Sequence, residues 1–215
     1  MESITSENNF SSAWKFFWAR KSSRIQFIIS ISVLASFTII FPHFFDYVES
    51  TKGKLLNDPL LEWLPAADVS WLIMALLYFG VISWIATFIK SPDILLAGMQ
   101  TYCLVTLLRL ISIPLFPLEP PLDYIPLKEP FVQFFTNGGR IISRDLFFSG
   151  HMTTILFCYY NTGKSTLKMV YLVSAIIIGI LLMIQRVHYA IDILAAPLFT
   201  WLCFLFVRKV LSTKI

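Results

Sequence analysis

Charged residues are scarce in this 215-residue chain. Asp, Glu, Lys and Arg make up 14% of it, against roughly 25% in soluble domains, and 57% of the residues are hydrophobic. This shortage excludes a soluble globular enzyme with a charged surface. The net charge of +4 does not indicate a nucleic-acid partner, because the basic residues flank apolar segments as membrane topology requires.

Cysteine is also rare, and ligand spacings are absent from the sequence. The three cysteines, Cys103, Cys158 and Cys203, all fall inside apolar segments, where small buried side chains are the simplest interpretation. The sequence contains no His-Glu-x-x-His or similar ligand pattern, so we expect no metal and no cofactor. There is no internal repeat and no low-complexity segment, which excludes a repeat architecture.

Long apolar runs are what the chain does contain. A membrane-spanning helix needs about 20 apolar residues, and six stretches reach or approach that length. We therefore predict an all-α membrane protein with six transmembrane helices over residues 25–211, preceded by a cytoplasmic or interfacial segment at 1–24 and followed by a cytoplasmic tail at 212–215. The six stretches are Ile25–Phe45, Trp71–Ile89, Ile94–Phe116, Leu146–Tyr160, Met169–Ile184 and Ile193–Val207.

The basic residues predict how the helices are oriented. With both termini on one side of the membrane, ten of the 17 Lys and Arg residues lie on that side and six on the other, over longer loops, while Arg109 lies inside a span. The positive-inside rule then places both termini in the cytoplasm. The residues before the first span are polar, then aromatic, then basic, which favours an interfacial helix over a signal peptide.

Two short segments carry most of the unusual polar residues, Phe148-Ser149-Gly150-His151 and His188-Tyr189-Ala190-Ile191-Asp192. They hold two of the three histidines, and polar groups are expensive within a bilayer, so function is the default explanation. The predicted topology brings six such residues to one depth of the outer leaflet. They are Arg109, Asp145, His151, Arg186, His188 and Asp192.

His188 and Asp192 are four residues apart, a spacing that places both on one face of a helical turn. Asp192 can then fix the tautomer of the imidazole and leave its other nitrogen as a base or nucleophile, for example toward phosphorus. The alternative is a helix-capping aspartate beside an interfacial histidine.

The segment Ser149-Gly150-His151 predicts the start of a helix. Glycine allows close backbone approach, free N–H groups favour a phosphate, and His151 can serve as a general acid. A polar helix start without a ligand is the alternative here.

Arg109 needs an anionic partner inside its span, either a lipid phosphate or a structural aspartate such as Asp145 or Asp192. For Arg144 and Arg186, interfacial anchoring competes with headgroup binding, and solvated loop acids are the expectation for Glu119 and Asp123. The phosphate or headgroup candidates are Arg109, Ser149, Gly150, Asp145 and Arg186.

These motifs resemble those of the sphingomyelin-synthase-like branch of the type 2 phosphatidic acid phosphatase superfamily. Residues 143–151, which end in Phe-Ser-Gly-His, are similar to that branch's Cys-Gly-Asp, two residues, Phe-Ser-Gly-His, and residues 188–193 to its His-Tyr-Thr-Ile-Asp-Val. The chain departs from the branch at Ser143-Arg144, where Cys-Gly is usual. It lacks the Arg-Pro of the wider superfamily, and a Phe precedes Ser149 where that superfamily has Pro.

The resemblance implies a lipid-phosphatase-like bundle with its active site on the exoplasmic leaflet, periplasmic or lumenal. His188 would take a phospho-headgroup from a phospholipid as a phosphohistidine, Asp192 would orient His188, and His151 would handle the leaving group. The acceptor would be ceramide, diacylglycerol or water.

Three functions are therefore open. They are a lipid phosphotransferase, a lipid phosphatase or phospholipase C-type hydrolase with the same His/His/Asp triad, and a non-catalytic lipid-binding or transport protein. The expected partners are lipids and the bilayer, with no nucleic acid.

Overall fold

The computed structural model describes residues 2–129, 141–163 and 165–211. These residues form helices joined by loops, and their one β-type contact is an isolated parallel bridge between Lys54 and Leu118. The protein is thus an all-α membrane bundle, as predicted. Its elements are α1 (Glu2–Ala19), α2 (Lys21–Ser50), α3 (Pro59–Glu62), α4 (Ser70–Phe88), α5 (Pro92–Leu115), α7 (Gly150–Tyr160), α8 (Thr166–Ile184), α9 (Ala190–Phe206) and the π-helical turn η1 (Val207–Leu211).

The predicted count of six spans is not exact. Within the described residues five segments are long and apolar enough to cross a membrane: α2, α4, α5, α8 and α9 continued by η1. The fourth predicted span, Leu146–Tyr160, is shorter than expected because Ser149 caps α7 and leaves residues 146–149 outside the helix. The 11 residues of α7 cover only about 16 Å, roughly half the hydrocarbon thickness.

The short helix α7 is the centre of the bundle. It packs against α4, α5, α8 and α9. Most of its residues are apolar, and six of its 11 are buried, among them Ile155, Phe157 and Cys158. A helix that is apolar on nearly every side belongs in an interior, so α7 is held by its neighbours rather than by lipid.

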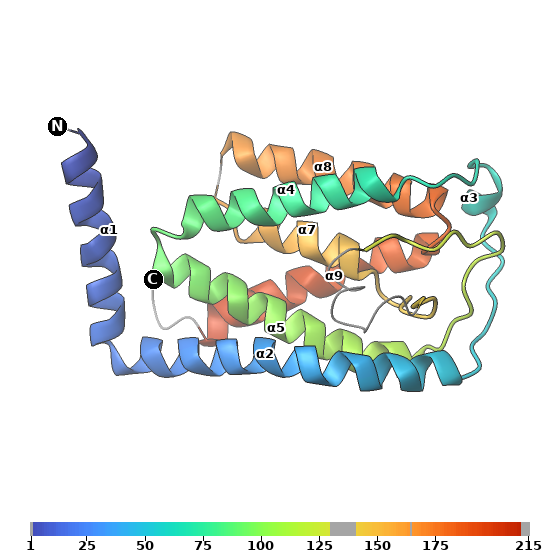
Figure 1. Cartoon of the computed structure of the whole chain (residues 1–215), viewed down its shortest axis with the longest axis horizontal. Coiled ribbons are helices and arrows are strands. Elements are labelled where there is room, and N and C mark those ends of the chain that lie inside the picture. Colours follow the sequence, from blue (N-terminus) through green and yellow to red (C-terminus); the bar gives the residue numbers. More distant parts are fainter. Residues whose placement is uncertain (1, 130–140, 164, 212–215) are drawn as a thin grey trace.

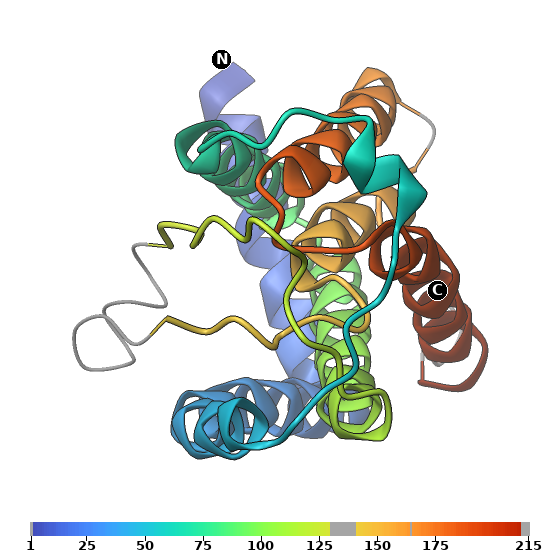
Figure 2. The ribbon, with the colours of Figure 1, turned by 90° about the vertical axis from the view of Figure 1, so that its right-hand side faces the viewer.

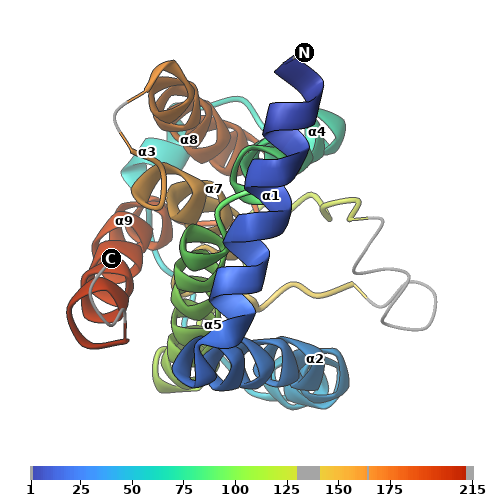
Figure 3. The ribbon, with the colours of Figure 1, turned by 90° about the vertical axis from the view of Figure 1, so that its left-hand side faces the viewer.

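The long helices run side by side, with α1 crosswise at one end and α3 with the long loops at the other (Figure 1). The end view from the α1 side shows α1 lying across the end of the bundle (Figure 3). Trp14 Nε1 of α1 donates to the carbonyl of Ile89 in the α4–α5 turn at 2.9 Å, and Arg20, which joins α1 to α2, pairs with Asp93 in the first turn of α5. The cytoplasmic or interfacial placement of residues 1–24 stays a prediction, and α2 already begins at Lys21, inside that range. The predicted tail, 212–215, lies outside the described residues.

Helix α2 is the least embedded of the long helices. It packs on α5 and α1 and leaves most of its apolar surface exposed. From the loop end, α2 and α4 stand apart, and the chain on either side of residues 130–140 extends between them (Figure 2). Residues of both helices line the pocket described next.

Candidate active site

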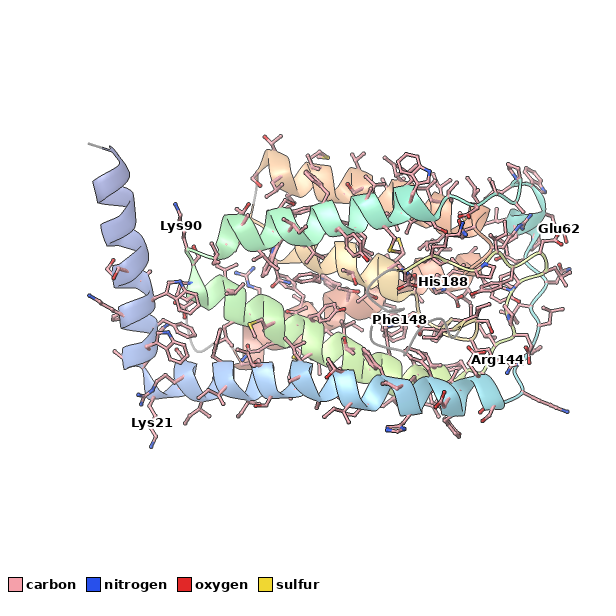
Figure 4. All side chains as sticks on the ribbon, in the orientation of Figure 1. Lys21, Glu62, Lys90, Arg144, Phe148 and His188 are labelled. Atoms are coloured by element: carbon pink, nitrogen blue, oxygen red, sulfur yellow. The ribbon has the colours of Figure 1, made fainter. Side chains whose placement is uncertain are left out.

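A pocket of about 550 Å³ lies among α2, α4, α5 and α7. The charged or titratable groups lining it in the described part of the chain are Arg109, Glu129, Asp145, His151 and His188, together with tyrosines. Figure 4 shows His188 in the half of the bundle nearer Glu62 and Arg144, while Lys21 and Lys90 mark the opposite end. The polar end of the pocket is therefore the end covered by the long loops.

His188 lies in the tight turn between α8 and α9, and its side chain is 3% exposed. Its Nδ1 lies 3.4 Å from Oδ2 of Asp192, which itself accepts the backbone N–H of Tyr189 at 3.0 Å in a capping box. Asp58, from the first long loop, accepts the N–H of Ala190 at 2.7 Å. Asp192 thus caps α9 and faces His188 at once, so the two sequence interpretations of this pair are compatible.

His151 is the second residue of α7, where the Ser149 hydroxyl caps the helix by accepting from the Met152 N–H at 3.4 Å. Its Nε2 lies 3.1 Å from Oε1 of Glu129, and its buried Nδ1 has no hydrogen-bond partner among the described residues. The rings of His151 and His188 are 6.1 Å apart. The two imidazoles, each beside a carboxylate, therefore face the same small volume.

Arg109 joins the start of α7 to the preceding loop. Its Nε donates to the carbonyl of Phe148 at 2.9 Å, and its Nη2 pairs with Asp145 at 2.5 Å. Burial raises the pKa of Asp145, but the charge and hydrogen bond of Arg109 outweigh burial and hold that pKa below its ordinary value. The structural partner of Arg109 is thus Asp145, one of the two that the sequence offered.

Gly150 is needed for this arrangement. A Cβ at this position would lie 2.5 Å from Nη1 of Arg109, closer than nonbonded atoms approach. The sequence suggested that Gly150 makes room for a ligand, whereas the structure shows that it makes room for a guanidinium. Since Arg109 itself lines the pocket, Gly150 shapes the site through it.

Two acidic residues, Glu119 and Glu49, hold the loop before α7. Glu119 forms a two-pronged ion pair with Arg144, its nearest contact being 2.8 Å, and Glu49 accepts the N–H groups of Ser143 and Arg144 at 2.6 and 2.7 Å. The N–H of Gly53 and the charge of Arg144 hold the pKa of Glu119 below its usual value. The prediction of a solvated loop acid is wrong for Glu119, because folding the two long loops together partly buries it.

All predicted site residues except Arg186 lie at the pocket or directly beside it. Arg109, Asp145, Gly150, His151 and His188 line the pocket, and Asp192 lies behind His188. Ser149 is fully buried as a helix cap.

Arg186 is the exception. It is not among the residues lining the pocket, and its Nη2 donates to the carbonyl of Leu64 at 2.8 Å. The geometry does not favour Arg186 as a headgroup ligand, because it serves the α8–α9 turn instead.

Glu129 is the site residue that the sequence interpretation missed. It lies in the proline-rich loop after α5, 22 residues before His151, and no spacing rule connects the two. The available signal was the length of that loop, since loops of this size often contribute to binding sites. Among the described residues, no group of three His, Cys, Asp or Glu side chains is arranged to hold a metal ion.

Comparison with known protein families gives a match to the last third of the chain. Residues 144–210 match the family described as PAP2 superfamily C-terminal, a range that contains α7, α8, α9 and both pocket histidines. The match supports the type 2 phosphatidic acid phosphatase superfamily, and with it a membrane enzyme of the lipid phosphatase or phosphotransferase type. It does not single out the sphingomyelin-synthase-like branch. No curated protein matches the chain.

Proposed function

We propose that this protein is a lipid phosphotransferase that moves a phospho-headgroup from a glycerophospholipid to a lipid alcohol through a phosphohistidine on His188. The observation that carries the proposal is the meeting of His188 and His151, each beside its own carboxylate, in one pocket with Arg109. A binding protein needs neither a nucleophile nor an acid, so this arrangement favours catalysis over lipid binding alone.

In the first step His188 attacks phosphorus. Its Nδ1 lies 3.4 Å from Oδ2 of Asp192, without a hydrogen bond among the described residues, and we assign Nε2 as the nitrogen that attacks from the pocket. A P–N bond forms and the P–O bond to the glycerol breaks, while His151 protonates the departing oxygen and diacylglycerol leaves. Asp192 stabilises the imidazolium that develops on His188. Glu129 does the same for protonated His151, whose Nδ1 is buried, has no hydrogen-bond partner among the described residues, and is the atom that we assign to give the proton.

In the second step the roles reverse. His151, now neutral, takes the proton of an incoming hydroxyl, whose oxygen attacks phosphorus while the P–N bond to His188 breaks. Arg109 stabilises the phosphoryl oxygens in both steps through Nη1, since Nε and Nη2 are used by Phe148 and Asp145. Ceramide and diacylglycerol are the acceptors we propose for this step.

The depth of the pocket favours a lipid substrate. Its walls include apolar or aromatic side chains from α2, α4 and α5, such as Phe41, Val81 and Tyr102. The α5 residues that line the pocket run from Arg109 at the polar end to Tyr102, about 10 Å of helix. A small phosphate ester needs no wall of that length, whereas an acyl chain covers it.

The charge balance favours a phosphodiester donor. In the described part of the pocket, the charges of Arg109 and protonated His151 are already balanced by the carboxylates of Asp145 and Glu129, with which they pair. A phosphate monoester dianion is poorly matched to that balance. A phosphodiester carries a single negative charge, and a cationic headgroup such as choline or ethanolamine would also meet Glu129 favourably.

Hydrolysis through the same phosphohistidine is the second candidate, and one observation supports it. The side chains of His151 and Glu129 are 16% and 27% exposed, against 3% and 0% for His188 and Asp192. Water can therefore approach the acid–base pair and replace the lipid alcohol in the second step.

Purified protein in lipid nanodiscs should be given phosphatidylcholine, phosphatidylethanolamine or phosphatidic acid labelled in the phosphate, with and without ceramide or a diacylglycerol whose acyl chains differ from those of the donor. We expect a labelled product on the added alcohol from at least one phosphodiester donor. A free phospho-headgroup or free phosphate as the only product would replace transfer by hydrolysis. No product from any donor would leave lipid binding as the function.

A further inference from the structure

We propose that Gln185 is a positioning residue for the acid–base pair, because it fixes the loop that brings Glu129 to His151. The inference rests on the proposed function, in which Glu129 supports the proton on His151. Gln185 caps the C-terminus of α8, three residues before His188, and its side chain is fully buried. Neither motif of the sequence includes it.

The side-chain amide of Gln185 joins three segments of the chain. Its Oε1 accepts the N–H of Val69 at 2.5 Å, and its Nε2 donates to the Ser70 hydroxyl at 3.1 Å and to the Ile125 carbonyl at 3.2 Å. Its backbone carbonyl accepts the N–H of Ile125 at 3.3 Å. A buried amide with these partners is costly to replace by an apolar group, because several polar groups then lose their partner together.

A second contact set secures the same loop one residue before Glu129. Lys128 Nζ pairs with Asp68 at 2.6 Å, and the Lys128 N–H donates to the Ser70 hydroxyl at 3.3 Å. Lys128 and the N–H and hydroxyl of Ser70 hold the pKa of Asp68 well below its usual range. Successive Cα atoms are about 3.8 Å apart, so holding Lys128 leaves Glu129 little freedom of position.

The same side chain also stands at the start of the turn that carries His188. Gln185 is followed by Arg186, whose φ of 58° turns the chain toward His188 and α9. One residue therefore sets the loop bearing Glu129 relative to the turn bearing His188. Misplacing a catalytic group by about 1 Å can cost on the order of 100-fold in rate, which gives this position a catalytic consequence.

The first test measures the loop and needs no activity. Gln185→Leu is compared with Gln100→Leu, a matched control in which a buried glutamine bonded to Gln26 is changed outside the pocket. Hydrogen exchange of the backbone between residues 118 and 129 should become faster in Gln185→Leu and stay unchanged in Gln100→Leu. Unchanged exchange in Gln185→Leu would overturn the proposal, whatever the enzyme does.

The second test connects the loop to catalysis through a double-mutant cycle on kcat. We expect Gln185→Leu to lower kcat about 10-fold with KM little changed, but to lower it less than about 2-fold when Glu129 is already Gln. Equal losses in both backgrounds would show that Gln185 supports the fold alone and would overturn its link to Glu129. If Gln185→Leu does not fold, Asp68→Asn replaces it as a milder change at a partly exposed residue. It should lower kcat by about 2-fold, and this loss should disappear when Glu129 is already Gln.

The two tests separate the inference from the proposed function. Faster exchange in Gln185→Leu together with full activity of Glu129→Gln would keep Gln185 as the anchor of the loop and reject the role of Glu129. Faster exchange with a loss of kcat that disappears in the Glu129→Gln background supports both.

Discussion

His188 and His151 each face a carboxylate at 3.1–3.4 Å, but the two carboxylates come from different parts of the chain. Asp192 lies four residues after His188 and is fixed by the cap of α9. Glu129 reaches His151 from a loop on another part of the molecule and depends on Lys128 and Gln185 for its position. One pair is built by local structure, and the other by tertiary contacts.

The difference fits the roles proposed for the two histidines. A nucleophile gains from a rigid, buried partner, and the side chains of His188 and Asp192 are almost inaccessible. An acid that must exchange protons with substrates gains from partial exposure, which His151 and Glu129 have. The changes considered next test this division, beginning with the one expected to cost most.

Replacing the nucleophile should have the largest effect. His188→Ala removes the atom that accepts the phosphoryl group, so kcat should fall by about 1,000-fold or more, with no labelled protein after incubation with phosphate-labelled lipid. The measurements are the rate of product formation and the amount of label bound to the protein through a bond that acid cleaves, as expected of phosphohistidine. His43→Ala is the matched control, because His43 is the third histidine of the chain and does not line the pocket. Full turnover by His188→Ala would remove the proposed mechanism.

The buried partner comes next. Asp192→Asn keeps an oxygen that can accept the Tyr189 N–H, so the cap of α9 survives, but it removes the charge that stabilises the His188 imidazolium. We expect kcat to fall by about 100-fold or more while thermal stability changes little. Burst kinetics should place the loss in formation of the phosphoenzyme. If only the breakdown of the phosphoenzyme slowed, the proposal that Asp192 stabilises the His188 imidazolium during attack would be wrong.

The sequence predicted the features of the site that depend on neighbouring residues, but not those that depend on contacts between distant segments. The spacing of His188 and Asp192 and the Ser149 start of α7 are contained in a few consecutive residues, and topology alone brought Arg109 and Asp145 to one depth. Glu129 could not be predicted in the same way, because its position depends on contacts with residues far away in the sequence.

The predicted count of six spans is inexact for a related reason, because α7 is a helix but is too short to span. Leu146 and Phe148 continue the apolar run of α7, but both are buried in a loop rather than in a helix. Hydropathy records that such residues avoid water and does not record which secondary structure they adopt.

The exposed partner should matter less than the buried one. Glu129→Gln keeps the size of the side chain and removes its charge, so we expect kcat to fall by about 10-fold at neutral pH. The alkaline limb of the pH–rate profile should move to lower pH, because His151 loses the nearby negative charge that favours its protonated form. Formation of the phosphoenzyme and its breakdown should both slow. An unchanged pH profile would place Glu129 outside proton transfer.

The smallest effect is expected for a change of Glu119, which contacts both the loop before His151 and the turn that contains His188. The side chain of Glu119 pairs with Arg144 before α7, while its backbone carbonyl accepts the Tyr189 hydroxyl beside His188. Glu119→Gln therefore weakens the His151 side alone. Because folding lowers the pKa of Glu119 from its ordinary 4.5, its ionisation stabilises the fold above that value, and the contribution disappears as pH falls through the lowered pKa.

The wild type should accordingly melt at most about 4 °C above Glu119→Gln at pH 7, and this difference should shrink as the pH approaches about 4. Thermal unfolding in detergent at the two pH values measures it. Asp123→Asn removes one charge from the same loop and serves as the control, with an expected change of less than about 1 °C. A difference that grows toward acid pH would mean that the Glu119–Arg144 pair does not stabilise the loop leading to His151.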